Sequence, residues 1–470
     1  MTRPIPAWYD DAKLGIFIHW GIFSVPAYAP RGRAITDIVR SHPEDGWARL
    51  PYTEWYPNSL RFPQSPVAAH HRARYGDRSY ESFRPDFDTA AEAFDAKAWA
   101  GLFAEAGAKY TVLVTKHHDG YCLWPTGIAN PHRPGWHAKR DFVGELADAS
   151  RAAGLTFGTY YSGGLDWTFR HHPIGTFGDM LACVPYEDDY AAYSAAQFRE
   201  LVDRYGSDVL WNDIAWPNED TRTALFDYFY AVKPDGVIND RWMANRGLFE
   251  AMRQAGPRAA LNARIQERWA KGEGDITPDS GSGDFKTAEY SSQFDYDRKW
   301  EACRGMDLSF GFNAEARPED YLTKDELIRS FVETVAHGGN LLLNMGPRAD
   351  GSVPDEQQAL LRALGAWLKV NGAAIYGTRK TAAPRGVTSD GTPYRLTQKG
   401  DTTYVLLLAR PRGRFTLPTV FGAGHAARLD GGRVALQGGD AVTLVCDTPF
   451  ADEPVHAIAL TGAGVRESHA

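Results

Sequence analysis

The sequence is poor in cysteine and lacks the usual marks of an exported protein. Only four cysteines occur in 470 residues, and their wide separation has no metal-ligand spacing. They predict reduced thiols rather than a disulfide framework or a zinc site. The N-terminus lacks the apolar core of a signal peptide, and no Asn-X-Ser/Thr glycosylation sequon occurs. We therefore expect a soluble protein that is located in the cytoplasm.

Long hydrophobic runs and blocks of positive charge are also absent. No run reaches the roughly 20 apolar residues that cross a bilayer. Lys and Arg number 51 against 59 Asp and Glu, which gives a formal net charge of −8. These properties argue against a membrane or a nucleic acid as a partner. By contrast, the 14 Trp and 22 Tyr are many for a soluble protein. Aromatic residues in such numbers usually form core, but they also suit carbohydrate clefts.

Strand and helix patterns alternate along the first three quarters of the chain. Helices are expected after Asp95 and Asp141, over about 190–205, after the Thr323/Glu326 capping box, and after Pro354. Short apolar runs predict buried strands at residues 14–22, 110–115, 155–161, 209–211, 236–241, 284–290, 308–312 and 340–345. Eight strands with mostly helical crossovers predict a (β/α)8-like TIM barrel. It is an imperfect one, because helices are missing around strands five to seven.

Three further regions have a different texture. Residues 24–92 lack clear periodicity, and a stretch this long inside a compact enzyme is usually a functional cover over a site. Residues 243–282 contain a short helix followed by a loop rich in Gly, Asp and Ser. After residue 378, short alternating segments separated by turns predict an antiparallel β-sandwich. We therefore divide the chain into a barrel domain, 1–378, and a sandwich domain, 379–470.

The stretch 208–216 (DVLWNDIAW) is the strongest candidate for chemistry. A short apolar run ends in Asn212 and Asp213, and α/β barrels place their catalytic groups at the carboxyl ends of strands. Trp211 and Trp216 flank the acid, and indole faces suit the apolar face of a sugar ring. Asp213 could equally cap the following helix. This stretch alone leaves both interpretations open.

The other strand ends supply partners for such an acid. They are His19, His117, His118, Tyr160, Tyr161, Trp211, Asp213, Arg241 and Glu289. Glycosidases need two carboxyl groups across the scissile bond, one ionised and one protonated. The residues alone do not favour Glu289 over Glu54, Asp119, Asp166 or Asp240, and Glu289 could be a solvated acid. Arg241 could be a surface cation, or it could favour an ionised carboxylate beside it.

The adjacent pair His117-His118 leaves a metal interpretation open, with His19 and Asp119 as further ligands. Neighbouring residues on a strand point to opposite faces. Both histidines can therefore face one pocket only if the strand bends at its end. Because the chain lacks a spaced carboxylate–histidine set, we expect no metal site and no cofactor. One histidine in the site and one packed behind it is the simpler alternative.

Several long motifs in one order resemble the α-L-fucosidases of glycoside hydrolase family 29. They begin at residue 8 (WYDDAKLGIFIHWG), 54 (EWY), 116 (KHHDG), 160 (YYSGGLDW), 210 (LWND), 284 (DFKTAEY) and 338 (GGNLLLN). The resemblance covers nearly the whole chain. It implies a catalytic (β/α)8-like barrel followed by a β-sandwich. It also implies hydrolysis of terminal α-L-fucosides with retention of configuration and without a metal.

The resemblance also implies roles for individual residues. Asp213 matches the nucleophile, and Glu289 matches the general acid/base of one subgroup. Positions that line the fucose pocket are matched by His19, Glu54, Trp55, His117, His118, Tyr160, Trp211 and Arg241. Residues 243–282 are longer than in the close relatives, which bears on the leaving-group side and on the place of Glu289.

The expected partner is a fucosylated oligosaccharide or glycoconjugate, and a homo-oligomer is compatible with the sequence. The alternatives are a fucose-binding protein that has lost turnover and a metal-dependent hydrolase that uses the histidine cluster.

Overall fold

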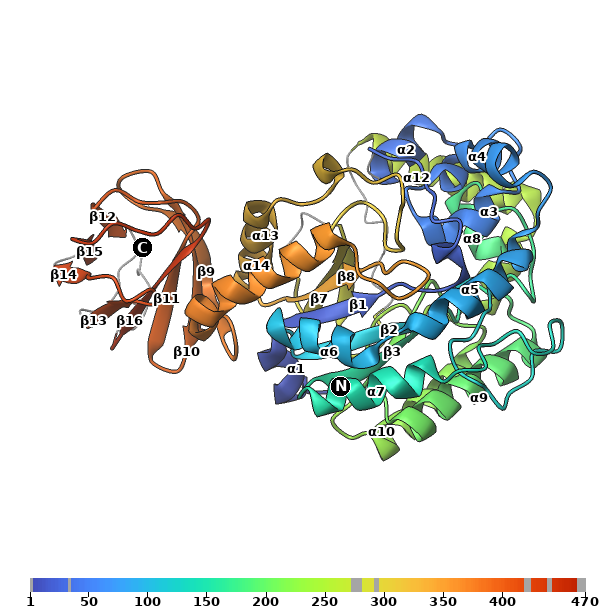
Figure 1. Cartoon of the computed structure of the whole chain (residues 1–470), viewed down its shortest axis with the longest axis horizontal. Helices are drawn as coiled ribbons and strands as arrows, with labels where there is room; N and C mark the ends of the chain where they lie inside the picture. Colours follow the sequence, from blue (N-terminus) through green and yellow to red (C-terminus); the bar gives the residue numbers. More distant parts are fainter. Residues whose placement is uncertain are drawn as a thin grey trace.

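Eight parallel strands form the centre of the larger part of the molecule (Figure 1). The computed structural model describes residues 3–32, 35–271, 281–290, 296–417, 424–437 and 442–462. The strands follow the order β5-β4-β3-β2-β1-β8-β7-β6. Their bounds are β1 (Leu14–Ile18), β2 (Tyr110–Lys116), β3 (Thr156–Tyr161), β4 (Val209–Asn212), β5 (Val237–Ile238), β6 (Lys286–Glu289), β7 (Trp300–Gly305) and β8 (Asn340–Met345).

The two outer strands of this order, β5 and β6, meet at a parallel bridge between Asn239 and Phe285. The Asp284 and Phe285 amides also donate to the Ile238 carbonyl, at 2.7 and 3.4 Å. The sheet therefore curls round until its edges touch. The predicted (β/α)8-like barrel is confirmed.

The main crossover helices begin where the sequence places their caps. Asp95 accepts hydrogen bonds from the Lys97 and Ala98 amides, Asp141 accepts from the Gly144 amide, and Thr323 and Glu326 form a capping box. Side-chain acceptors at these positions satisfy amides that have no partner inside a helix. The helices are α6 (Ala96–Glu105), α7 (Phe142–Ala152), α9 (Asp188–Tyr205), α10 (Glu219–Val232), α13 (Lys324–Ala336) and α14 (Asp355–Asn371).

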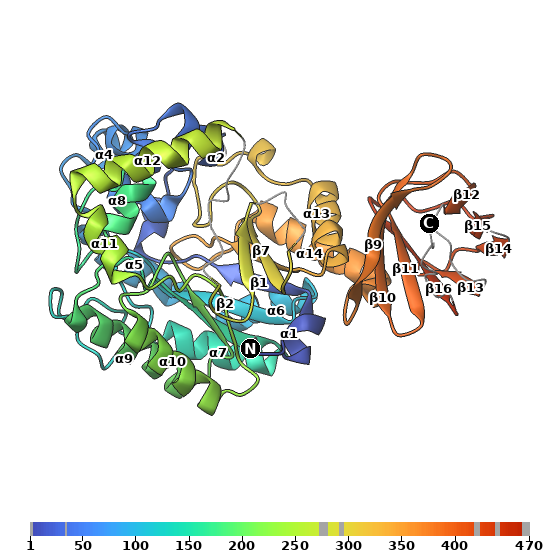
Figure 2. The same ribbon diagram turned by 180° about the vertical axis from the view of Figure 1, so that it is seen from behind.

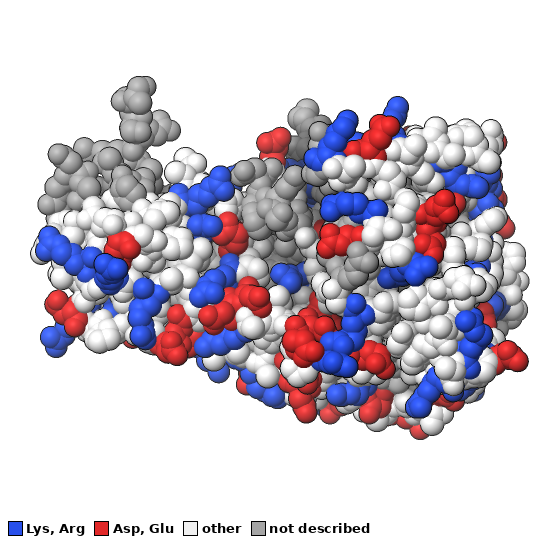
Figure 3. All heavy atoms as spheres, turned by 90° about the horizontal axis from the view of Figure 1, so that it is seen from above, with Lys and Arg blue, Asp and Glu red and all other residues white. Residues whose placement is uncertain are grey.

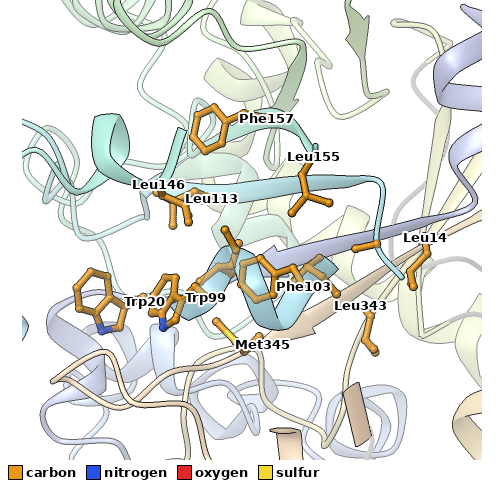
Figure 4. Packing of buried hydrophobic residues seen from close by; sticks show 14 of the residues in the cluster. Leu14, Trp20, Trp99, Phe103, Leu113, Leu146, Leu155, Phe157, Leu343 and Met345 are labelled. Atoms are coloured by element: carbon orange, nitrogen blue, oxygen red, sulfur yellow. The ribbon is translucent and has the colours of Figure 1, made fainter. Parts of the chain in front are cut away.

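Two layers of core follow from the alternation of side chains along the strands. In β1, Leu14, Ile16 and Ile18 face the helices, whereas Phe17 faces into the barrel. Figure 4 shows the outer layer, in which strand residues lie beside the side chains of α6 and α7. The inner layer is rich in aromatic residues and continues to the carboxyl ends of the strands. It packs Phe17, Tyr110, Tyr160, Trp211 and Phe285.

One predicted strand is wrong, and another lay unrecognised beside it. Residues 308–312 form bends and loop, and the seventh strand is β7. Glu301 and Arg304 interrupt the apolar pattern of β7, so it does not look like a buried strand. The first strand is also shorter than expected, because the chain leaves the sheet after Ile18 and enters the 3₁₀ turn η1 (Ile22–Ser24).

The long segment before α6 folds into short helical turns at one end of the barrel. Most of these turns are too short to show a clear period in the sequence. The turns are α2 (Ile35–Ser41), η2 (Gly46–Arg49), η3 (Thr53–Trp55), α3 (Tyr56–Ser59), α4 (Pro66–Tyr75), η4 (Tyr80–Phe83), α5 (Arg84–Ala90) and η5 (Ala91–Ala93). In the longest, α4, only Val67, Ala68 and His71 are buried. A further short helix, α1 (Ala7–Ala12), precedes β1.

The segment after β5 is more helical than the sequence indicates. It holds α11 (Arg246–Met252) and α12 (Ala255–Ala270), while residues 272–280 of the predicted loop lie outside the described residues. These helices contact α8 (Phe177–Ala182), and α12 also contacts α2. Figure 2 shows α2, α8, α11 and α12 together at one end of the barrel.

Two antiparallel sheets follow the barrel, as predicted. Trp367 of α14 donates to the Val455 carbonyl (3.0 Å), and Arg395 pairs with Glu333 of α13. The first sheet has the order β13-β16-β11-β10-β9 and the second β12-β15-β14. Their strands are β9 (Arg379–Val387), β10 (Pro393–Lys399), β11 (Thr402–Leu407), β12 (Arg414–Leu417), β13 (His425–Arg428), β14 (Ala435–Gln437), β15 (Val442–Val445) and β16 (His456–Thr461). The domain boundary at 378/379 stays a prediction.

The surface agrees with the charge balance of the sequence. On the face in Figure 3, acidic and basic side chains are interspersed. None of the helices in the described ranges is long and apolar enough to cross a bilayer. The four cysteines are all buried and unpaired, in agreement with the predicted reduced thiols.

Candidate active site

A cavity of about 460 Å³ opens at the carboxyl ends of the strands. All ten residues singled out in the sequence line it, although they come from seven separate stretches of chain. They are His19, Glu54, Trp55, His117, His118, Tyr160, Trp211, Asp213, Arg241 and Glu289. The structure therefore brings together every one of the proposed site residues.

Asp213 directly follows β4 and is 8% exposed. Its Oδ1 accepts hydrogen bonds from Arg241 Nη1 (2.8 Å) and the Ile214 amide (2.9 Å), and its Oδ2 accepts one from the Tyr160 hydroxyl (2.8 Å). Burial by itself would raise the pKa of Asp213, but the Arg241 charge, His118 and these bonds outweigh burial and lower it. Asp213 is therefore an ionised carboxylate at neutral pH.

The residue after this acid has an unusual backbone. Ile214 has a φ of 68°, in the left-handed region that β-branched residues rarely enter. Such a conformation costs about 1–3 kcal/mol and persists where the surroundings impose it. Here it brings the Ile214 amide onto the carboxylate of Asp213, so the strain helps to orient the acid.

Glu289 ends β6 and faces the same cavity. The Tyr52 hydroxyl donates to its Oε1 and Arg241 Nη2 donates to its Oε2, both at 2.9 Å. Arg241 also donates from Nε to Thr287 Oγ1 (3.0 Å). One guanidinium thus holds both carboxyl groups, and neither acid is the solvated strand end or plain helix cap that the sequence left open.

The three histidines are buried, and each adds an imidazole to the cavity wall. His19 Nδ1 shares a hydrogen bond with Asn344 Oδ1, and His118 Nδ1 shares one with Ser162 Oγ, both at 2.6 Å. Burial lowers the pKa of His19 to about 3 and that of His118 to about 4. These imidazoles are therefore neutral at neutral pH, the form in which a ring can both donate and accept hydrogen bonds.

His117 and His118 both reach the cavity, so the alternative with one packed behind is wrong. The register of β2 against β3 shifts between Val114 and Lys116, directly before the two histidines. This irregularity supplies the bend that the adjacent pair requires. Within the described ranges, no group of three or more His, Cys, Asp and Glu side chains is arranged to hold a metal ion.

Glu54 is the third carboxyl group of the cavity, and it differs from the other two. It is 2% exposed, and its Oε2 accepts a hydrogen bond from the Gly311 amide (3.0 Å). Burial raises the pKa of Glu54 to about 8, and the negative charge of Glu289 adds to this rise. Glu54 is therefore protonated at neutral pH and can donate a hydrogen bond.

The other acidic residues considered from the sequence are bonded to neighbouring protein groups. Asp166 forms a fully buried ion pair with Lys116 (2.6 Å), and Asp119 accepts from the Tyr80 hydroxyl outside the cavity lining. Asp240 lines the cavity but accepts hydrogen bonds from the Thr287 amide and hydroxyl. Tyr161 points away from the cavity, and its hydroxyl bonds Gln197.

Sequence reasoning missed the residues that support the site from behind. Glu301 of β7 is fully buried and accepts from the Trp211 indole (3.0 Å) and the Tyr9 hydroxyl (2.8 Å). Burial raises the pKa of Glu301 to about 6. Glu301 fixes the Trp211 ring, over which the Arg241 guanidinium lies at 4.7 Å. An acidic residue inside a buried strand could have indicated this supporting role in the sequence, but β7 was not recognised as a strand.

Comparison with known proteins decides the family. A sequence profile described as "Alpha-L-fucosidase" matches residues 1–373. The chain belongs to the α-L-fucosidase family. The tissue α-L-fucosidase of Bos taurus is 33% identical over 421 residues, which cover 87% of this chain and 76% of that protein. The plasma α-L-fucosidase of Homo sapiens is 33% identical over 429 residues, with 87% and 77% covered.

Solved structures of α-L-fucosidases agree. The Thermotoga maritima α-fucosidase in complex with fucose has a TM-score of 0.80 and 38% identity, with 97% of each chain covered. The α-L-fucosidase isoenzyme 1 of Paenibacillus thiaminolyticus has a TM-score of 0.69 at 28% identity, again with 97% of each chain covered. The protein is thus a glycoside hydrolase of the α-L-fucosidase type, and the family expected from the motifs is confirmed.

Proposed function

We propose that this α-L-fucosidase is a retaining exo-enzyme that removes terminal α-L-fucosyl residues from fucosylated glycans through a covalent fucosyl-enzyme. Asp213 is the nucleophile and Glu289 is the general acid/base. The observation that carries the proposal is the Arg241 guanidinium, which holds the two carboxyl groups in one cavity. A pair of carboxyl groups across the scissile bond is what a retaining mechanism needs.

The reaction has two steps. In the first, an Asp213 oxygen bonds to the anomeric carbon while the bond to the aglycone oxygen breaks, and that oxygen takes the proton of Glu289. In the second, Glu289 takes a proton from water, the water oxygen bonds to the anomeric carbon, and Asp213 leaves as a carboxylate. Glu289 must hold a proton in the first step, so we expect Arg241 to pair with Asp213 alone in the substrate complex.

The remaining cavity residues bind the sugar in this proposal. Neutral His19 and His118 exchange hydrogen bonds with hydroxyl groups, and protonated Glu54 donates one. The Trp55 ring offers an apolar surface to the ring carbons, and Trp211 supports Arg241 from beneath. Phe17, Tyr160 and Trp211 pack inside the barrel at the base of the cavity, which favours the binding of a terminal sugar.

Azide rescue of two variants tests the roles of the acids. Asp213→Gly removes the nucleophile, so no covalent intermediate forms, and azide that enters the vacated space gives a fucosyl azide of inverted configuration. Glu289→Ala still forms the intermediate from activated aryl fucosides, and azide then gives the retained product. We expect Glu289→Ala to lose far more activity on poor leaving groups than on activated ones.

Two results would contradict these roles. An equal proportional loss on activated and unactivated fucosides would remove Glu289 as the acid/base, and Glu54 would be the first replacement. A fucose complex with the two carboxyl groups roughly 6.5–9.5 Å apart, rather than about 5–5.5 Å, would indicate inversion. Release of nitrophenol from an aryl α-L-fucoside separates the enzyme from a fucose-binding protein without turnover.

A further inference from the structure

The cavity has two chemically different parts. The inner part holds the charged and imidazole groups described above. The outer part is apolar, and its walls come from α2, η2, α8 and the loop after β5. Trp47, Met180 and Leu181 are 4%, 5% and 2% exposed, so these side chains are already packed in place. The apolar wall residues are Ile35, Trp47, Phe177, Met180, Leu181 and Met243.

A row of aromatic rings connects the two parts. The Trp55 ring lies 5.2 Å from the His118 ring and 5.3 Å from the Trp47 ring, measured between centroids. The Trp47 ring in turn lies 6.3 Å from that of Phe177 in α8. If a sugar occupies the inner part, the group attached to it would therefore lie along a row of aromatic side chains.

The outer part has little to offer a hydroxyl-rich group. Among the described lining residues, the polar side chains of this part are Arg222 and Asn245. Arg222 donates to Glu219 (2.7 Å) and to the Trp242 carbonyl (3.2 Å), and Asn245 Oδ1 accepts from the Leu248 amide (2.9 Å). The Trp47 indole N–H is buried and has no hydrogen-bond partner within the described residues. A second pyranose ring would lay most of its hydroxyl groups against apolar walls here and regain few of its hydrogen bonds to water, which is costly.

We propose that this apolar part is the leaving-group subsite and that it takes an aryl or alkyl aglycone. The inference rests on the proposed function, since it assumes that the sugar occupies the inner part. Burying one methylene group is worth about 0.8 kcal/mol, or roughly a fourfold change in binding. The subsite therefore favours apolar fucosides over fucosylated sugars of similar size.

A series of alkyl α-L-fucosides tests this preference. Methyl, propyl, butyl and hexyl alcohols are leaving groups of similar basicity, so differences in kcat/KM report contacts of the chain. We expect kcat/KM to rise by roughly threefold to fourfold per added methylene until the subsite is filled. A fucosyl-galactose disaccharide should be hydrolysed with a lower kcat/KM than the hexyl fucoside. A flat series, or a disaccharide that exceeds the hexyl fucoside, would overturn the inference.

Two methionine variants provide a matched comparison. Met180 lines the cavity, whereas Met252 is equally buried in the same apolar cluster but does not line it. Met180→Ala should lower the ratio of kcat/KM for butyl over methyl fucoside by about fourfold or more, and Met252→Ala should keep the wild-type ratio. Equal ratios in both variants would contradict the subsite.

The two proposals fail in different ways. If no fucoside of any kind is hydrolysed, the proposed function is wrong. If fucosides are hydrolysed but chain length and Met180→Ala have no effect on the ratio, only the apolar subsite is wrong.

Discussion

At the scale of single residues, Glu54 gives the sharpest pH dependence. Burial raises its pKa to about 8, so its carboxyl proton is present below that pH and is lost above it. We expect kcat/KM of the wild type to fall as pH rises through about 8. Glu54→Gln keeps a neutral donor that does not titrate, so it should flatten this decline, while Glu54→Ala should lose activity at every pH.

The same pKa shift affects stability. A folded-state pKa above the ordinary value of 4.5 gives stability that is complete below about 4.5 and is lost as pH rises through about 8. Between pH 5 and pH 8, the unfolding temperature of the wild type should therefore fall relative to that of Glu54→Gln. If the decline of kcat/KM above pH 8 persists unchanged in Glu54→Gln, it belongs to another group.

The buried histidines lead to a prediction about chelators. His19 and His118 each bond a neutral side chain through Nδ1 and are uncharged, which suits contacts with sugar hydroxyls. We expect hydrolysis of an aryl α-L-fucoside to survive prolonged dialysis against a strong chelator. Loss of activity that added zinc restores would instead support the metal-dependent hydrolase, and inductively coupled plasma analysis of the untreated enzyme would identify the ion.

At this scale the sequence predicts the residues that line the cavity but not those behind them. His19, Asp213 and Glu289 lie at strand ends or within motifs, where a pattern can be seen. Tyr52, Asn344 and Glu301 act through contacts with residues far away in the chain. Tyr52, for example, bonds an acid 237 positions later. Such contacts depend on how the barrel closes, and no local spacing records them.

At the scale of elements, the end of β2 depends on a buried ion pair. Lys116 and Asp166 are both fully buried and 2.6 Å apart. Removing one partner of such a pair costs about 3–5 kcal/mol, because the other charge is left without compensation. Lys116→Met should therefore lower the free energy of unfolding by this amount and disturb His117 and His118, which follow directly.

A second variant separates charge from packing. The double change Lys116→Met and Asp166→Asn should recover part of the lost stability, since no buried charge remains. Arg40 pairs with Asp37 at the surface, so Arg40→Met should cost less than about 1 kcal/mol. If urea titrations give equal unfolding free energies for the Lys116→Met and Arg40→Met variants, the buried pair stabilises the fold no more than the surface pair does.

Elements with a strong local pattern could be predicted. The continuous apolar runs of β1, β2 and β8 and the caps of α6, α7 and α13 identify them in the sequence. β7 could not be recognised, because Glu301 and Arg304 break its apolar run. Hydrogen bonds from Tyr9, Tyr110 and Trp211 make a buried acid acceptable there. Most turns of residues 24–92 could not be predicted because they are too short to show a period, and α4 buries too few apolar residues to show one.

At the scale of the whole molecule, the barrel wall has a seam between β5 and β6. The backbone contacts there are few among the described residues, and side chains supply the rest. Asp284 Oδ2 accepts from the Ile238 amide, Asp240 Oδ1 accepts from the Thr287 amide, and Arg241 reaches both Thr287 and Glu289. The two carboxyl groups proposed for catalysis, Asp213 and Glu289, lie on opposite sides of this seam.

Heating should therefore inactivate the enzyme at a lower temperature than the one at which the protein unfolds. The side-chain hydrogen bonds across the seam should break at a lower temperature than the continuous backbone hydrogen bonds between the other strands. We therefore expect the midpoint of reversible thermal inactivation to lie below the calorimetric unfolding temperature. Amide exchange in residues 236–241 and 284–290 should rise first, and bound fucose should narrow the gap between the two midpoints. If the two midpoints coincide, the contact between β5 and β6 is as stable to heat as the rest of the barrel. We expect an enzyme that loses activity while it is still folded and recovers that activity on cooling.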